Sequence, residues 1–400
     1  MTVAVPVSTP WPAQRLAASL FLVLGTDMFI ISPLLPQISS SFGVSSSEAS
    51  VMGWSFSLVY AALSPVAALV SNRFTRRSAM WFGAAVFSVG TLAVAVLPTL
   101  DLVVVGRVIA AAGAAIMGPP VWSFASETAA PHEVGKAVAA VASTFAAGQV
   151  IGVPLGSLIA SFASWRWVFL GLGLVGAILA VTIGLRLGPE ARIPERIRFT
   201  AAARESLSLW RQKNFSFLVC ANFFAQATRY ATYTFAGALL LSRFGLDTAE
   251  LGMVGMAVGL GSLAGAATGG RLMDRVHARN GSQPLLNVVY ASIMTCSILL
   301  ATMPEILWLS LVGWVVTFAA GSAFVSNGQE LLSQAGGRNR AYALSWNNAA
   351  LYAGTAAGTY LLGLVALGGT SFILIAGASG AFTVAASLIL WRRTETPARR

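Results

Sequence analysis

The chain has 400 residues, of which 56% are hydrophobic and only 10% are charged. An average soluble domain carries about 25% charged residues, so this composition excludes an ordinary water-soluble protein. The formal net charge is +11, but most basic residues stand between or beside apolar runs. We therefore expect no nucleic-acid partner and interpret the basic residues as a topology signal.

Apolar runs of spanning length follow one another along the chain. A transmembrane helix needs roughly 20 apolar residues, and only helices satisfy their own backbone polar groups in lipid. The first six expected helices lie near 15–37, 50–71, 78–98, 102–124, 137–162 and 167–187. After an arginine-rich stretch, six more lie near 215–241, 249–270, 285–303, 306–327, 341–364 and 370–391. The sequence predicts an all-α integral membrane protein with twelve transmembrane helices.

The arginines alternate between the two sides of the expected membrane. With a cytoplasmic N-terminus, the outer loops keep only Arg166 and Arg243, and the inner segments hold nearly all other basic residues, as the positive-inside rule requires. The segment Met1 to Gln14 has no basic n-region or cleavage site, so we expect no removable signal peptide. We expect a multi-pass protein of the inner (cytoplasmic) membrane with both termini in the cytoplasm.

The two halves of the sequence resemble each other. A shift of 202 residues places Glu48 on Glu250 and Gly53 on Gly255. Repeats of this kind, parallel to each other, bind their substrate near mid-membrane between the halves. We expect two pseudo-symmetric six-helix bundles and a cytoplasmic linker, at residues 1–187, 214–400 and 188–213 respectively.

Three ionisable side chains fall inside expected helices: Asp27, Arg107 and Arg229. Each costs several kcal/mol in the bilayer, roughly 2.5–3.5 on insertion scales, and is a functional hypothesis by default. Asp27 and Arg229 are related by the 202-residue shift, so we expect both to face one central cavity. Asp27 either couples protons or contacts substrate, or it is a static ion-pair partner. Arg229 either binds an anionic solute or neutralises Asp27.

Polar side chains also recur at three- and four-residue spacing along the seventh expected helix. Residues at this spacing share one helix face, and a polar face inside a span should line a wet cavity. The eleventh helix adds further polar and aromatic side chains. The expected substrate-binding residues are Asp27, Asn222, Gln226, Arg229, Tyr230, Tyr233, Trp346 and Asn347.

Short motifs occur in the order expected for one family. Asp27 precedes Pro33 and Pro36 in the first helix, and Arg107 precedes Gly113 in the fourth. The other motif residues are Asn72, Arg73, Arg77, Gly148, Gly152, Pro154, Gly156, Gly270, Asp274 and Arg275. Over essentially the whole chain, the sequence resembles the Major Facilitator Superfamily, and within it the twelve-helix drug:proton antiporter and sugar-efflux branch.

The resemblance implies the major facilitator fold and roles for these motifs. It implies that Asp27 and Arg107 carry proton coupling, and that the glycines of the fifth helix seal it against the eighth. The loop after the second helix has Asn72 where the family has Asp. We therefore expect an asymmetric cytoplasmic gate that depends more on Asp274 and Arg271 than on Arg73. The alternative is a cluster of arginines that only sets topology.

The expected function is secondary active transport, namely proton-coupled efflux of a small organic solute or drug by alternating access. The alternatives are an uptake symporter or uniporter, or a non-transporting protein of this fold that acts as a sensor, scaffold or membrane enzyme. No phosphate-binding loop or metal-ligand set is present in the sequence. We expect no enzymatic activity, cofactor or metal. The expected partners are a small-molecule substrate, protons and the lipid bilayer, and the expected state is a monomer.

Overall fold

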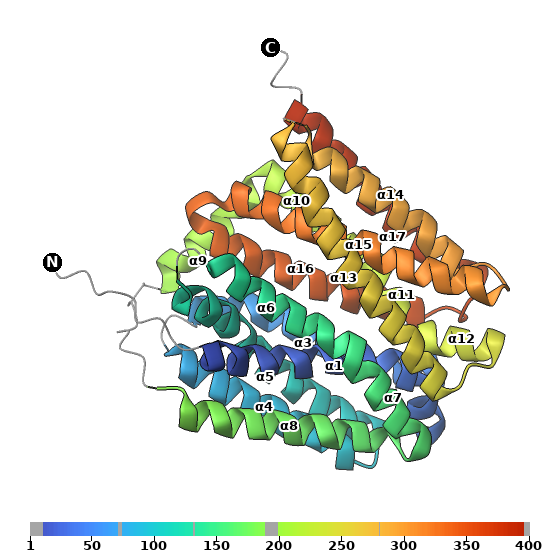
Figure 1. Cartoon of the computed structure of the whole chain (residues 1–400). Coiled ribbons are helices and arrows are strands. Elements are labelled where there is room, and N and C mark those ends of the chain that lie inside the picture. Colours follow the sequence, from blue (N-terminus) through green and yellow to red (C-terminus); the bar gives the residue numbers. More distant parts are fainter. Residues whose placement is uncertain (1–10, 71–73, 131–132, 189–198, 280, 396–400) are drawn as a thin grey trace.

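The fold is a bundle of helices. The computed structural model describes residues 11–70, 74–130, 133–188, 199–279 and 281–395, and every regular element within these ranges is a helix. Figure 1 shows the helices of the first half (blue to green) packed side by side below those of the second half (yellow to red). The predicted all-α class is confirmed.

The first half contains six crossings of the bundle. The second crossing is two helices joined end to end, and the fifth contains a π-helical turn, η2. The elements are α1 (Trp11–Phe42), α2 (Ser46–Ala49), α3 (Val51–Val70), α4 (Arg76–Val96), α5 (Leu100–Thr128), α6 (Val134–Ala147), η2 (Gly148–Gly152), α7 (Val153–Phe162) and α8 (Trp165–Arg186).

The second half also contains six crossings, of which the first is interrupted by a second π-helical turn, η4. The elements are α10 (Lys213–Gln226), η4 (Ala227–Ala231), α11 (Thr232–Thr234), α12 (Ala236–Phe244), α13 (Thr248–Ala278), α14 (Gln283–Thr302), α15 (Leu307–Gly336), α16 (Arg340–Gly363) and α17 (Thr370–Glu395). Two short helices, α9 (Phe199–Ser208) and η3 (Leu209–Arg211), precede them. They fall inside the expected linker, whose boundaries stay a prediction.

Ten of these crossings are long and apolar enough to span a bilayer by themselves. The other two are the interrupted segment from α10 to α12 and α16, which carries Asn347 and Asn348. Together they make the predicted twelve. Both exceptions belong to the second half, where the polar side chains of the expected site are concentrated.

Small residues let neighbouring helices approach closely. In lipid the hydrophobic effect does not draw helices together, so close packing of small side chains carries much of their association. At the α4–α5 contact, a Cβ added to Gly83 would lie 2.7 Å from the backbone nitrogen of Met117. Between the halves, α3 packs against α16 and α7 packs against α13. The first helix of the chain, α1, also packs against α12 and α13 of the second half.

The turn after the first helix of each half has the same construction. Gly43 and Gly245 both adopt positive φ, at 65° and 71°, which costs little only for glycine. The next helix then begins in both halves with a capping box, Ser45 with Glu48 and Asp247 with Glu250. These turns are 202 residues apart, so the sequence repeat is also a structural one.

The two arginines of the expected outer loops cap the C-terminal ends of helices. Arg166 donates from Nη1 to the carbonyl of Leu97, 2.7 Å away, at the end of α4. Arg243 donates to the carbonyls of Thr302, at the end of α14, and Gly368. Helix C-termini leave carbonyls unsatisfied and carry partial negative charge. These two exceptions to the charge alternation therefore have a local structural reason.

Candidate functional site

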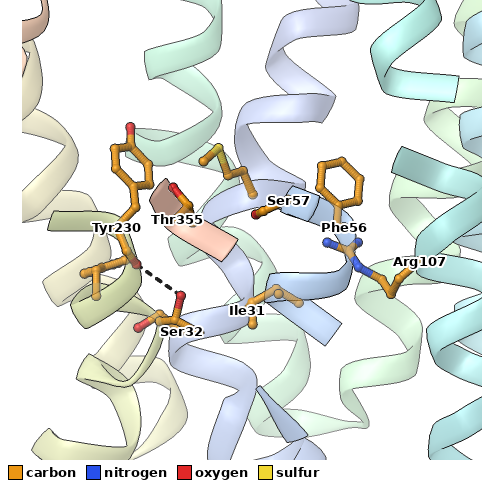
Figure 2. A pocket seen from close by; sticks show the side chains of 11 residues that line it. Ile31, Ser32, Phe56, Ser57, Arg107, Tyr230 and Thr355 are labelled. Carbon is orange, nitrogen blue, oxygen red and sulfur yellow. Dashed lines mark hydrogen bonds between the residues drawn. The ribbon is translucent and has the colours of Figure 1, made fainter. Parts of the chain in front are cut away.

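A cavity lies between the two halves, near the middle of the bundle. It is narrow in this structure, with a water-accessible volume of about 20 Å³. The lining residues come from α1, α3, α5, η4, α11 and α16, and they are Met28, Ile31, Ser32, Gly53, Phe56, Ser57, Arg107, Tyr230, Tyr233, Thr234 and Thr355. Figure 2 shows Tyr230 on one wall and Arg107 with Phe56 on the opposite wall. The cavity is thus faced by both halves, as the repeat predicts.

Asp27 and Arg107 form a buried ion pair beside this cavity. Nη1 of Arg107 donates to Oδ1 of Asp27 at 2.7 Å, and the two side chains are 1% and 0% exposed. Nε of Arg107 donates to the carbonyl of Met52 at 3.0 Å, and its guanidinium lies 4.5 Å from the ring centroid of Phe56. Among the described residues, Oδ2 of Asp27 has no partner. The pair joins α1 to α5 and leaves one carboxylate oxygen without a hydrogen bond to a described residue.

Arg229 does not neutralise Asp27 in this structure. Its Nη1 donates to Oγ of Ser322 at 3.0 Å and to the carbonyl of Phe318 at 3.5 Å, both on α15. Gly321 makes room for it, because a Cβ there would lie 2.5 Å from Cδ of Arg229. Asp27 contacts α5, the fourth crossing of the first half, and Arg229 contacts α15, the fourth crossing of the second half. Each side chain therefore points into the helix bundle of its own half.

The expectation that Asp27 and Arg229 face one central cavity is therefore corrected. Neither lines the cavity, and both are buried, with 0% and 4% of their surface exposed. Each lies behind a residue that does line it, Arg107 in the first half and Tyr230 in the second. Asp27 and Arg229 occupy corresponding positions in the two halves, but the cavity is lined by the residues in front of them.

The polar stripe expected along the seventh crossing is divided between two surroundings. Tyr230 and Tyr233 line the cavity. Asn222 instead faces α15, since a Cβ added to Gly328 would lie 3.3 Å from its Nδ2. Gln226 is 5% exposed and is absent from the cavity lining. The expectation of one wet face is wrong because η4 interrupts the helix and changes the angular spacing after it.

The two expected residues of the eleventh crossing do not reach the cavity either. Nε1 of Trp346 donates to Oγ of Ser206 on α9 at 2.9 Å, and its ring packs edge-on against Trp210. Trp346 lies in the second turn of α16 and contacts the short helices before α10, so it anchors them. Asn347 is 1% exposed and is absent from the cavity lining.

Several lining residues were not expected from the sequence. Ile31, Phe56 and Met28 look like ordinary lipid-facing or core residues in an apolar run, and nothing in the sequence marks them. Ser57 and Thr355 are polar within spans. That is a weak signal, because small hydroxyl residues often bond to their own helix.

The glycines of the fifth crossing face the first helix rather than the eighth crossing. Gly148 and Gly152 pack against Thr26 on α1, whose Oγ1 donates to the carbonyl of Gly148 at 3.1 Å. The contact with α13 is made by glycines of α13 itself. A Cβ added to Gly252 would lie 3.2 Å from Cα of Pro154. Gly156 packs against Ile30 and Val168. The two crossings do meet, but the glycines at that contact belong to α13.

At the arginine-rich end, the ion pairs between described residues belong to the first half, and one of them joins two helices. Nη2 of Arg76 lies 3.0 Å from Oε1 of Glu127 and joins α4 to α5, and Arg77 donates to the carbonyl of Gly184 on α8. Asn72 and Arg73 lie outside the described residues. Asp274 forms no ion pair within the described ranges.

The remaining gate residues make little contact. Arg275 lies in the last turn of α13. Gly270, also on α13, has nothing within 4 Å of an added Cβ. The expected dependence of the gate on Asp274 stays a prediction, and no contact in this structure speaks for it.

The sequence matches a family model and named relatives. The model described as Major Facilitator Superfamily matches residues 17–325 and 218–400. The chain is 25% identical over 349 residues to the uncharacterized MFS-type transporter YceJ of Bacillus subtilis, covering 87% of each chain. It is 27% identical over 372 residues to the chloramphenicol resistance protein of Streptomyces lividans, covering 90% of each.

Solved structures show the same fold at low sequence identity. A D-xylose-proton symporter superposes with a TM-score of 0.76 at 18% identity, covering 95% of this chain and 96% of that chain. A bacterial homolog of the human lysosomal transporter Spinster, in an inward-facing and occupied conformation, gives 0.75 at 17%, with coverage of 97% and 98%. The expected family resemblance and the expected fold are both confirmed.

Proposed function

We propose that this chain, which belongs to the Major Facilitator Superfamily, exports a small organic solute in exchange for protons, by rocking of its two halves around the central cavity. The proposal rests on the fully buried Asp27–Arg107 pair, one member of which lines that cavity. A buried carboxylate held by a single arginine can be neutralised in two ways, by the ion pair or by a proton.

Protonation of Asp27 is the step that would change the cavity. When the carboxylate is ionised, Arg107 is held by Asp27 and by the carbonyl of Met52. A proton on Oδ2, the oxygen without a partner among the described residues, removes the charge that holds the guanidinium. Arg107, which already lines the cavity, is then released from Asp27, so protonation changes the net charge of the pair and the position of the guanidinium that the solute meets at the cavity wall.

The direction and sidedness of transport are further parts of the proposal. Efflux is favoured by the names of relatives, such as the chloramphenicol resistance protein and a lincomycin resistance protein of Streptomyces lincolnensis, which is 30% identical over 201 residues. The arginine-rich end and both termini would face the cytoplasm. The protein would act as a monomer. Each charge moved through 100 mV is worth about 2.3 kcal/mol, which sustains a solute gradient of about fiftyfold.

The test is transport by the purified protein in proteoliposomes with an imposed pH gradient. A panel of neutral, cationic and carboxylate-bearing solutes is screened for proton flux that depends on the solute. We expect Asp27→Asn to abolish this flux without loss of folded protein, because asparagine keeps an oxygen that accepts the Arg107 bond. Asp101→Asn is the matched control, since Asp101 is exposed in the first turn of α5.

Other outcomes separate the alternatives. Proton flux that survives Asp27→Asn removes Asp27 from the mechanism. Solute counterflow without any pH dependence indicates a uniporter, and solute uptake driven by inward proton movement indicates a symporter. No flux of any solute in the panel rejects transport as proposed.

A further inference from the structure

Arg229 is a buried cation whose charge no acid compensates within the described residues. Its side chain is 4% exposed. The ion pairs Arg76–Glu127, Arg107–Asp27 and Lys136–Glu133 all lie in the first half and do not involve it. Among the residues that the structure describes, Asp27 is the only buried acid, and it is already bound to Arg107. Buried charges are normally paired because their desolvation is costly, so an unpaired one inside a membrane protein indicates a ligand or a pathway.

The guanidinium is held so that one of its edges stays unused. Nη1 is occupied by Oγ of Ser322 and by the carbonyl of Phe318. Nε is buried and has no partner in the described ranges, and no hydrogen bond from Nη2 to a described residue is formed. The N–H groups of Nε and Nη2 point in parallel from the same edge of the plane. That edge matches the two oxygens of a carboxylate, which arginine binds in a bidentate manner.

The surroundings fix this orientation. The guanidinium carbon lies 4.5 Å from the ring centroid of Tyr230 and 5.1 Å from that of Phe318, so aromatic side chains hold the plane of the cation. Gly321 supplies the space, since a Cβ there would lie 2.5 Å from Cδ and 2.9 Å from Nη1 of Arg229. These features would suit any buried arginine, but they leave the bidentate edge, and not Nη1, without a partner.

The site is one side-chain layer from the central cavity. Tyr230 lies on the cavity wall (Figure 2) and also stacks near the guanidinium of Arg229. Tyr230 is therefore a side chain that separates the guanidinium of Arg229 from the cavity. Tyr230 is partly exposed, whereas Arg229 behind it is buried.

From this geometry we infer that the Nε–Nη2 edge of Arg229 is a subsite for a carboxylate of the transported solute, reached from the cavity past Tyr230. The inference rests on the proposed transport function and adds a substrate class to it, namely organic anions or zwitterions that carry a carboxylate. Asp27 and Arg107 serve the proton in the first half, and Arg229 binds the anionic group from the second.

The inference is tested by ligand binding to the purified full-length protein in detergent, without any transport step. Sodium benzoate is titrated by calorimetry and compared with neutral benzamide, which has the same ring but no charge, and with sodium phosphate and sodium chloride. We expect the wild-type protein to bind benzoate at least about tenfold more tightly than benzamide, since a charged hydrogen-bonded partner contributes that much, and to show no saturable binding of phosphate or chloride.

The variants separate the bidentate edge from charge alone. Arg229→Met should weaken benzoate binding at least about tenfold, and Arg229→Lys should recover only part of the loss, because lysine keeps the charge but lacks the planar fork. Arg393→Met is the matched control, because Arg393 is exposed at the end of α17. Gly321→Ala keeps the arginine and displaces it, so it should also weaken benzoate. Thermal unfolding of each variant checks that it is folded.

Equal affinity for benzoate and benzamide in the wild type overturns the inference, and so does benzoate affinity unchanged by Arg229→Met. Binding of phosphate or chloride in place of benzoate also overturns it, because the site would then take inorganic anions. The result is separable from the proposed function. Proton flux that survives Asp27→Asn rejects proton coupling but leaves Arg229-dependent benzoate binding in place, whereas loss of benzoate preference with Asp27-dependent flux intact rejects the carboxylate subsite alone.

Discussion

Removal of only one member of the Asp27–Arg107 pair should destabilise the protein more than removal of both. The side chains are 0% and 1% exposed and share a 2.7 Å hydrogen bond. Loss of one partner from such a buried pair leaves an uncompensated charge and costs about 3–5 kcal/mol, whereas apolar replacement of both is often neutral. We therefore expect Asp27→Leu to lower the unfolding free energy by that amount, and the double variant Asp27→Leu/Arg107→Met to recover most of it.

The assay is thermal unfolding in detergent, followed by intrinsic tryptophan fluorescence, for the wild type, both single variants and the double variant. The difference between the double change and the sum of the single changes gives the coupling energy of the pair. Arg107→Met should cost less than Asp27→Leu, because a carboxyl group left alone can take up a proton while a guanidinium cannot lose one. If the single and double losses simply add, the two side chains do not form a buried pair, and the proton-coupling scheme loses its basis.

Three further predictions concern contacts away from the pair. Glu127→Gln should cost at most about 1 kcal/mol, since the Glu127 carboxylate that binds Arg76 is 39% exposed, and it should raise the labelling rate of cysteines introduced at that end of α5. Gly252→Ala should slow solute flux, because the added Cβ would lie 2.5 Å from Cβ of Ser157 across the α7–α13 contact. Gly270→Ala is the control and should leave the flux unchanged, because nothing lies within 4 Å of its added Cβ. Equal flux in both variants would contradict the close-contact argument. Trp346→Phe removes one hydrogen bond to α9 and should cost about 1 kcal/mol without changing solute affinity, and an altered affinity would return Trp346 to the binding site.

The number, order and repeat of the helices were accessible from the sequence because they depend on one-dimensional features. Apolar length sets the spans, and the 202-residue shift relates Gly43 to Gly245 and Glu48 to Glu250, whose turns match in the structure. The identity of buried charges was accessible for the same reason. An ionisable residue within an apolar run stands out in any window.

The direction in which these residues point was not accessible. The stripe from Asn222 to Tyr233 was assigned to one face by assuming regular helical spacing, and η4 at Ala227–Ala231 breaks that spacing in its middle. Nothing in the sequence marks a π turn. In the same way, the glycines near Gly148 were expected to face α13, but the partner of a small residue depends on which neighbour brings a bulky group to it, here Thr26.

The arginine caps at the expected outer loops show that the two halves make the same contact from different positions. The position 202 residues beyond Arg166 is occupied by Gly368, which has no side chain to offer. Arg243 arrives from a different loop, bonds to the carbonyl of that glycine and also caps the third helix of its half. An alignment of the halves would score the arginine as lost, yet a guanidinium still covers the same helix end. The same helix end is thus capped by a guanidinium in both halves, although the arginine comes from a different loop in each.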